Sequence, residues 1–169
     1  MVTYDKWRLA MIGEFAIKHV EFTIKQIEKI REKSFHIGTR HRQLIRPDLF
    51  RNAIVMTDNA SNCLAGVGLV PKGLFVFHDP PFRVLNHELP IAKSMRSVGI
   101  IGGSLTHWEA TQESYNKSGI VFEYIKKPKG EERNTDLSFA FAINISNLSI
   151  EYGYYQNPKG YSNDGWLFE

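Results

Sequence analysis

Three apolar runs that follow one another from Ala53 constrain the fold more than any other feature. They read "AIVMTD", "LAGVGLV" and "LFVFHD", and turn-forming residues separate them at 59–62 and in "PKG". Short runs of this kind, bounded by turn signals, are typical of β-strands joined by hairpins. We therefore expect three consecutive strands at the start of a sheet.

The segments on either side complete an α/β pattern. Between about Tyr4 and Lys33 there is no proline, and apolar residues recur at steps of three and four, which predicts one long amphipathic helix: Ile17, Val20, Ile24, Ile27 and Ile30. After the three strands, Asn86 is expected to cap a short helix. The runs "VGII", "SLTHWEATQESYNKSG" and "IVFEYIKK" then predict a βαβ unit. The tail predicts antiparallel strands in "LSFAFAINIS", "LSIEYGYYQ" and "GWLFE".

Length and composition indicate one domain, 1–169. A chain of 169 residues can bury one ordinary core, and its 43% hydrophobic and 23% charged residues are near globular averages. No apolar run reaches the roughly 20 residues of a membrane-spanning helix, and charges interrupt "MVTYDKWRLAMIGEF" where a signal peptide would be apolar. The single Cys63 has no disulfide partner, so we expect a buried thiol in a reducing compartment. These features predict an intracellular (cytoplasmic) protein without membrane contact.

Positive charge is concentrated near the N-terminus. Residues 1–51 hold 11 Lys and Arg against 6 Asp and Glu, whereas the rest of the chain holds 10 against 12. Clustered cations bind phosphate backbones because binding releases condensed counterions. We predict a nucleic-acid-binding segment, with a solvated surface as the alternative; its candidate residues are Arg40, His41, Arg42, Arg46 and Arg51.

From Ala53 to about Ser138, the chain resembles the RNase H domains of retroelements. "IVMTDNASNCLAGVGLV" looks like their first two strands, "NHELPIAKSM" is similar to the helix that carries their glutamate, and "VFEYIKKPKGEERNTDLS" is similar to the last strand and the turn before a final aspartate. The resemblance implies an α/β (α+β) fold with a mixed sheet of RNase H-like order in 53–138. A long N-terminal helix and the basic segment would precede it in 1–50, and an antiparallel β extension would follow in 139–169.

The same resemblance implies a metal-dependent catalytic site. Its metal ligands would be Asp58, Glu88 and Asp136. Such carboxylates hold two Mg²⁺ or Mn²⁺ ions, about 4 Å apart, that clamp the attacking and leaving oxygens of a phosphodiester. The family carries another aspartate where this sequence has Gly102, Gly103 and Ser104. Either Glu109 substitutes for it, or the domain is degenerate and binds nucleic acid without cleaving it.

Shorter matches suggest other ligands. A strand, Gly-Gly-Ser and a helix can hold a phosphate on backbone N–H groups, and "GIIGGS" looks like the phosphate-binding turn of methylthioadenosine phosphorylases. "GTRHR" is similar to the ATP-phosphate motif of diadenylate cyclases. Arg31 and His36 have the loose Arg-x4-His spacing of HEPN ribonucleases, which are all-helical, whereas the rest of this chain is rich in expected strands.

Three functional hypotheses follow. The leading one is an RNase H-like domain that binds RNA or an RNA–DNA hybrid, with cleavage as a metal-dependent nuclease left open. The second is a nucleotide- or phosphate-binding domain that uses the turn 102–104. The third is a structural or assembly subunit whose N-terminal helix and aromatic C-terminal strands contact a protein partner or a second copy of the chain.

Overall fold

The computed structural model describes residues 16–46, 53–70, 73–80, 97–117, 120–131 and 136–158. In these ranges the chain forms ten strands and two helices. They are β1 (Ala16–His19), α2 (Ile24–Lys33), β2 (Ser34–His36), β3 (Arg42–Ile45), β4 (Ile54–Ala60), β5 (Leu64–Val70), β6 (Gly73–Asp79), β7 (Ser97–Gly103), α3 (Leu105–Lys117), β8 (Ile120–Ile125), β9 (Leu137–Asn144) and β10 (Ser149–Gln156).

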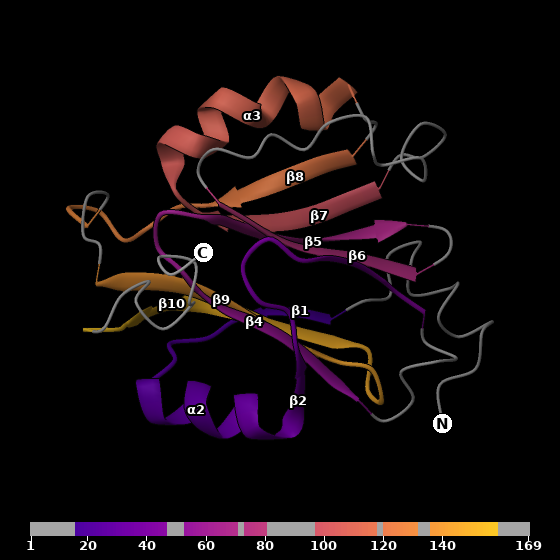
Figure 1. Cartoon of the computed structure of the whole chain (residues 1–169), viewed down its shortest axis with the longest axis vertical. Helices are drawn as coiled ribbons and strands as arrows, with labels where there is room; N and C mark the ends of the chain where they lie inside the picture. The colour runs from indigo at the N-terminus through magenta and orange to yellow at the C-terminus, as the bar shows by residue number, and fades with distance from the viewer. Residues whose placement is uncertain are drawn as a thin grey trace.

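The strands form two mixed five-stranded sheets that pack face to face (Figure 1). Sheet A has the order β1-β10-β9-β4-β2, and sheet B has the order β3-β6-β5-β7-β8. Helix α2 covers the outer face of sheet A and α3 covers the outer face of sheet B, so the molecule has four layers (Figure 1). This arrangement buries β4, β6 and β9 on both faces, whereas the edge strand β1 stays exposed.

Strand alternation explains why the apolar residues divide into three layers. In β6, Leu74 and Val76 point between the sheets, whereas Phe75 and Phe77 point toward α3. On the α3 side, Phe77 packs against Tyr115, with ring centroids 5.6 Å apart. On the α2 side, Ile27 is fully buried in a smaller cluster. Each helix therefore has its own apolar contact with one sheet.

Local sequence signals define α2. Thr23 caps it in a reciprocal capping box with Gln26, and Arg31 and Lys33 lie in its last turn, where cations favour the helix dipole. Its ten residues span the face of sheet A between β1 and β2, which lie at opposite edges. Within the described ranges, no helix is long and apolar enough to cross a membrane.

The predicted helix from Tyr4 to Lys33 is only partly present. Its last ten residues form α2, but Ala16–His19 form β1, which pairs in parallel with β10; residues before 16 lie outside the described part of the chain. Pairing with a distant strand overrides the local periodicity. Gly153 helps to admit the incoming chain, because a Cβ there would lie 1.9 Å from the carbonyl oxygen of Val20.

The expected strands at 53–58, 64–70 and 74–79 are confirmed as β4, β5 and β6. The βαβ unit is also confirmed as β7, α3 and β8, and β9 and β10 form the expected antiparallel pair.

The expectation of a single mixed sheet is wrong, because β4 belongs to sheet A whereas β5 pairs with β6 and β7 in sheet B. A bulge between Thr57 and Ala60, with Asn59 at φ 62°, lies where the chain passes between the sheets. The short helix expected at Asn86 and the strand expected at "GWLFE" lie outside the described residues.

Replacing Gly103 with alanine is expected to destabilise the fold by about 2 kcal/mol or more. Gly103 has φ 117°, and a Cβ at this position would lie 2.0 Å from the carbonyl oxygen of Cys63. Gly130→Ala is the matched control, because Gly130 also has a positive φ of 90° but a Cβ there would meet nothing within 4 Å. Denaturant unfolding of both variants measures the difference, and equal losses of stability would show that the contact with Cys63 is unimportant.

Candidate functional site

Asp58 lies near the end of β4, on the face of sheet A that α2 covers. Neighbouring residues of the strand alternate: Val55 belongs to the core between the sheets, and Met56 to the cluster under α2. Asp58 follows the direction of Met56, and its side chain is only 2% exposed. A carboxylate this deeply buried requires partners, because burial penalises the ionised form.

Two cationic or polar side chains supply those partners. Arg31, in the last turn of α2, donates from Nε to Asp58 Oδ2 at 2.9 Å and also donates from Nη2 to the same oxygen. His36, at the end of β2, places Nε2 2.9 Å from Asp58 Oδ1. Both carboxylate oxygens are therefore engaged. Through these contacts Asp58 holds α2 and the edge strand β2 to β4.

The electrostatics favour an ionised Asp58. Burial alone raises the pKa of Asp58, but the hydrogen bonds and charges of His36 and Arg31 outweigh burial and bring the pKa below its usual value. Arg31 and His36 remain 37% and 33% exposed. A carboxylate at Nε2 favours the imidazole tautomer with its proton on that nitrogen, so Nδ1 is the basic nitrogen that a ligand would meet.

A second histidine lies behind this site, between the two sheets. Thr57 Oγ1 donates to the carbonyl of Ile37 at 2.6 Å and lies 2.9 Å from Nδ1 of His78. Because the hydroxyl proton is already used, Nδ1 of His78 is the donor to Thr57. His78 is fully buried, and burial lowers its pKa from 6.5 to about 4. Among the residues that the structure describes, none hydrogen-bonds its Nε2. His78 is therefore neutral at pH 7 and bridges sheet B to sheet A.

The three predicted metal ligands have different environments. Asp58 is held by Arg31 and His36, Asp136 is exposed just before β9, and Glu88 lies outside the described residues. The carbonyl of Asp136 accepts from the backbone N–H of Asn157, whose side chain bonds Asn59, so Asp136 and Asp58 lie near the same end of sheet A.

These surroundings do not fit a hard cation at Asp58 itself. Its immediate partners are a guanidinium and an imidazole, whereas Mg²⁺ and Mn²⁺ prefer several oxygen ligands. Within the described ranges, no group of three or more His, Cys, Asp or Glu side chains could hold a metal. With Glu88 not described, the two-metal site stays a prediction, but the contacts of Asp58 support a different role for this residue.

The predicted basic segment also divides in the structure. Arg42 is 13% exposed and pairs with buried Asp79 at 3.1 Å, so it fastens β3 to β6. Arg40, His41 and Arg46 are exposed, and Arg51 lies outside the described residues. The loop that carries Arg40 and His41 is fixed to His78, because the N–H of Arg40 donates to the carbonyl of His78 and the N–H of His78 donates to the carbonyl of His41. This loop therefore follows His36 directly, and its other end is hydrogen-bonded to His78, the residue that also bonds Thr57.

The predicted phosphate turn, 102–104, has a clear packing role. A Cβ at Gly102 would lie 2.6 Å from the ring of Phe139 in the facing sheet. The N–H of Gly103 donates to the Tyr154 hydroxyl and the N–H of Ser104 donates to the carbonyl of Cys63, both at 2.9 Å. Ser104 also caps α3, because its Oγ accepts from the N–H of His107. Two of the N–H groups expected to meet a phosphate are thus engaged within the protein.

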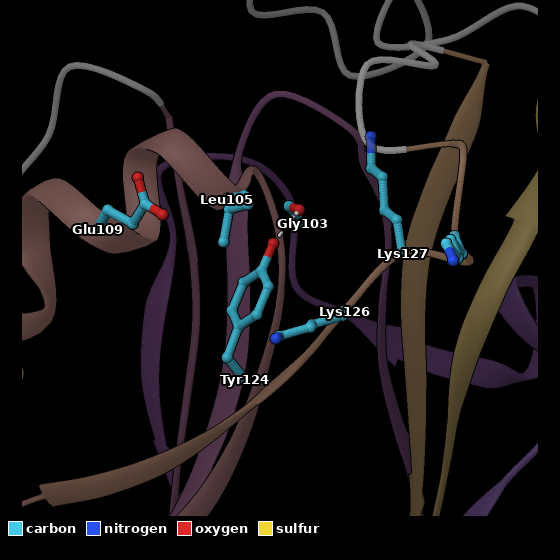
Figure 2. Close-up of a pocket in the computed structure, with 7 residues that line it drawn as sticks. Gly103, Leu105, Glu109, Tyr124, Lys126 and Lys127 are labelled. Carbon is cyan, nitrogen blue, oxygen red and sulfur yellow. Dashed lines mark hydrogen bonds between the residues drawn. The ribbon is translucent and has the colours of Figure 1, made fainter.

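A pocket nevertheless opens beside this turn (Figure 2). Its volume is about 390 Å³, and its lining residues are Gly103, Leu105, Glu109, Tyr124, Lys126, Lys127 and Lys129. The resemblance to RNase H domains assigned the segment that carries these lysines to a strand and a turn, and it gave the lysines no role. The close spacing of Lys126, Lys127 and Lys129 just after β8 was the sequence signal for a cationic pocket. The expected burial of Cys63 next to the turn is confirmed.

No family model matches this chain, and a search of curated proteins finds no match either. The resemblance to RNase H domains therefore stays a prediction. The functional conclusions rest on the residues and their geometry.

Proposed function

We propose that this protein binds RNA at the Asp58 site, meaning Asp58 with Arg31 and His36, and cleaves it there. The supporting observation is that one buried carboxylate engages both side chains while each stays about one third exposed. Asp58 already holds Arg31 and His36 in place. These two side chains therefore lose little conformational entropy when they bind one phosphodiester. The adjacent exposed Arg40 adds a positive charge beside the site that an RNA phosphate can contact.

The chemistry needs an RNA substrate and no metal ion. Nδ1 of His36 takes the proton of a ribose 2′-hydroxyl, whose oxygen then bonds to the adjacent phosphorus. The P–O5′ bond breaks, the 5′ oxygen takes a proton from water, and the resulting hydroxide takes the proton from His36. The products are a 2′,3′-cyclic phosphate and a 5′-hydroxyl. Arg31 donates Nε and Nη2 to Asp58, so Nη1 is the nitrogen that would contact the phosphate oxygens.

Asp58 acts as a positioning residue in this mechanism. It fixes the tautomer of His36 and stabilises the imidazolium that forms when the proton is taken. The competing version of the same function uses Asp58, Glu88 and Asp136 as ligands of Mg²⁺ or Mn²⁺. The two versions make opposite predictions for cleavage in EDTA, and wild-type protein assayed with and without metal distinguishes them.

Replacing Arg40 with glutamine is expected to weaken RNA binding roughly three- to tenfold at low salt, and the difference should shrink as salt rises. Lys117→Gln is the matched control, because it removes the same charge from an exposed lysine paired with Glu113. Lys117 belongs to α3, which covers sheet B, whereas the Asp58 site lies on the sheet A side with α2 (Figure 1). Fluorescence anisotropy with labelled single-stranded RNA measures both. Equal losses in the two variants would indicate that only net charge matters and would contradict a defined RNA surface.

A further inference from the structure

The pocket beside the N-terminal end of α3 combines cationic and apolar walls. Figure 2 shows Lys126 and Lys127 on one side and Leu105 on the other, with the ring of Tyr124 between Leu105 and Lys126. The walls come from the turn after β7, from α3 and from the end of β8 with the residues that follow it. These elements belong to the sheet B side of the molecule, whereas α2 covers sheet A (Figure 1). The pocket is therefore separate from the Asp58 site.

Its charge favours an anionic ligand. Three lysines and one glutamate line the pocket, so the ionised groups leave a net positive charge. Lys127 is partly buried, and this burial lowers its pKa even though the charge of Glu131 acts in the opposite direction. An anion beside Lys127 would offset the cost of burying its charge. The N-terminal end of α3 adds a partial positive charge of its own.

Its apolar wall is rigid. The Tyr124 hydroxyl donates to the carbonyl of Gly103 at 2.7 Å, and Trp108 stacks on the ring with centroids 5.8 Å apart and an angle of 12° between the planes. Burial raises the pKa of Tyr124, so the phenol stays protonated. Because its hydroxyl is already engaged, Tyr124 offers the pocket a fixed aromatic surface.

We propose that this pocket binds a mononucleotide, with the phosphate among Lys126, Lys127 and Lys129 and the base against Tyr124 and Leu105. The volume of about 390 Å³ lies at the lower end of the roughly 300–1,000 Å³ typical of small-molecule sites, which suits one nucleotide better than a dinucleotide. Glu109, which also lines the pocket, accepts a hydroxyl or amino hydrogen of the ligand. This binding does not depend on the RNA site.

Isothermal titration of the full chain with AMP, adenosine and inorganic phosphate tests the proposal. AMP should bind more tightly than either fragment, because only AMP contacts both walls. Lys127→Gln should weaken AMP binding about five- to tenfold, whereas Lys117→Gln, at the far end of α3, should leave it unchanged. Tyr124→Leu should weaken AMP but not inorganic phosphate, so phosphate binding reports that this variant is still folded.

Several outcomes would overturn the assignment. Absence of AMP binding at millimolar concentration would remove the site altogether. Adenosine binding as tightly as AMP would contradict the role of the lysines, and phosphate binding as tightly as AMP would contradict a nucleotide. AMP affinity unchanged in Lys127→Gln would place the ligand elsewhere. None of these results depends on whether the protein cleaves RNA.

Discussion

His36→Gln is expected to slow RNA cleavage by at least about 100-fold while RNA affinity stays within about threefold of wild type. The Gln side-chain amide can place a donor near Asp58 Oδ1, 2.9 Å from Nε2 in the wild type, but it has no basic nitrogen to accept the 2′-hydroxyl proton. Binding and catalysis should therefore separate. Single-turnover cleavage and anisotropy on the same labelled RNA measure the two effects together.

His41→Gln is the matched control for this variant. His41 is an exposed histidine five residues further along, and Asp58 accepts from Arg31 and His36 instead. We expect its cleavage rate to stay within about threefold of wild type, because a positioned base contributes far more than one exposed side chain near the substrate. If His36→Gln cleaves as fast as His41→Gln, then His36 is not the general base.

The free energy of unfolding is expected to fall by about 3 kcal/mol between pH 7 and pH 4 because of His78. Burial lowers the pKa of His78 from 6.5 to about 4 in the folded protein, an effect that the charge of Asp58 opposes and those of His36 and His41 reinforce. Below pH 6.5 His78 is protonated in the unfolded chain but stays neutral in the folded protein until the pH approaches 4. The stability associated with neutral His78 is therefore complete above pH 6.5 and is lost as the pH falls toward 4.

Urea unfolding at several pH values, compared between wild type and His78→Asn, measures this contribution. The asparagine amide can still donate toward Thr57 Oγ1 but does not titrate. The variant should lose about 3 kcal/mol less than wild type over this range. Asp58 affects the free energy of unfolding at lower pH. Its pKa is depressed in the folded protein, so its stabilising effect is lost only as the pH falls below the ordinary aspartate range. Parallel pH profiles in the two proteins would contradict the buried neutral state of His78.

Local patterns predicted those elements whose partners lie nearby in the sequence. Runs of six or seven apolar residues identified β4, β5 and β6, and the βαβ unit followed from one helix between two short strands. The division into two sheets could not be predicted, since it depends on a bulge at Asn59 and on pairings such as Ala16 with Ser149. Helical periodicity over 16–19 was misleading, because these residues pair in parallel with the distant strand β10 instead.

The candidate sites also depend on contacts between residues that are far apart in the sequence. Asp58 was recognised as a carboxylate at a strand end, but its partners Arg31 and His36 come from α2 and β2 and meet it only after the chain folds. Their Arg-x4-His spacing was visible in the sequence, although the all-helical family it suggests does not match this fold. Glycines 102 and 103 suggested a phosphate turn, whereas their Cβ positions are occupied by Phe139 and by the Cys63 carbonyl.

The most direct test of the account is cleavage of one RNA oligonucleotide by wild-type protein in EDTA, alongside the same sequence with a single 2′-deoxy substitution at the main cleavage position. We predict cleavage in EDTA, a 2′,3′-cyclic phosphate end, and complete protection by the 2′-deoxy substitution. Cleavage that occurs only with Mg²⁺ or Mn²⁺ and survives the substitution would contradict the role of His36 and support the metal site of Asp58, Glu88 and Asp136. RNA that stays intact under all these conditions would contradict both.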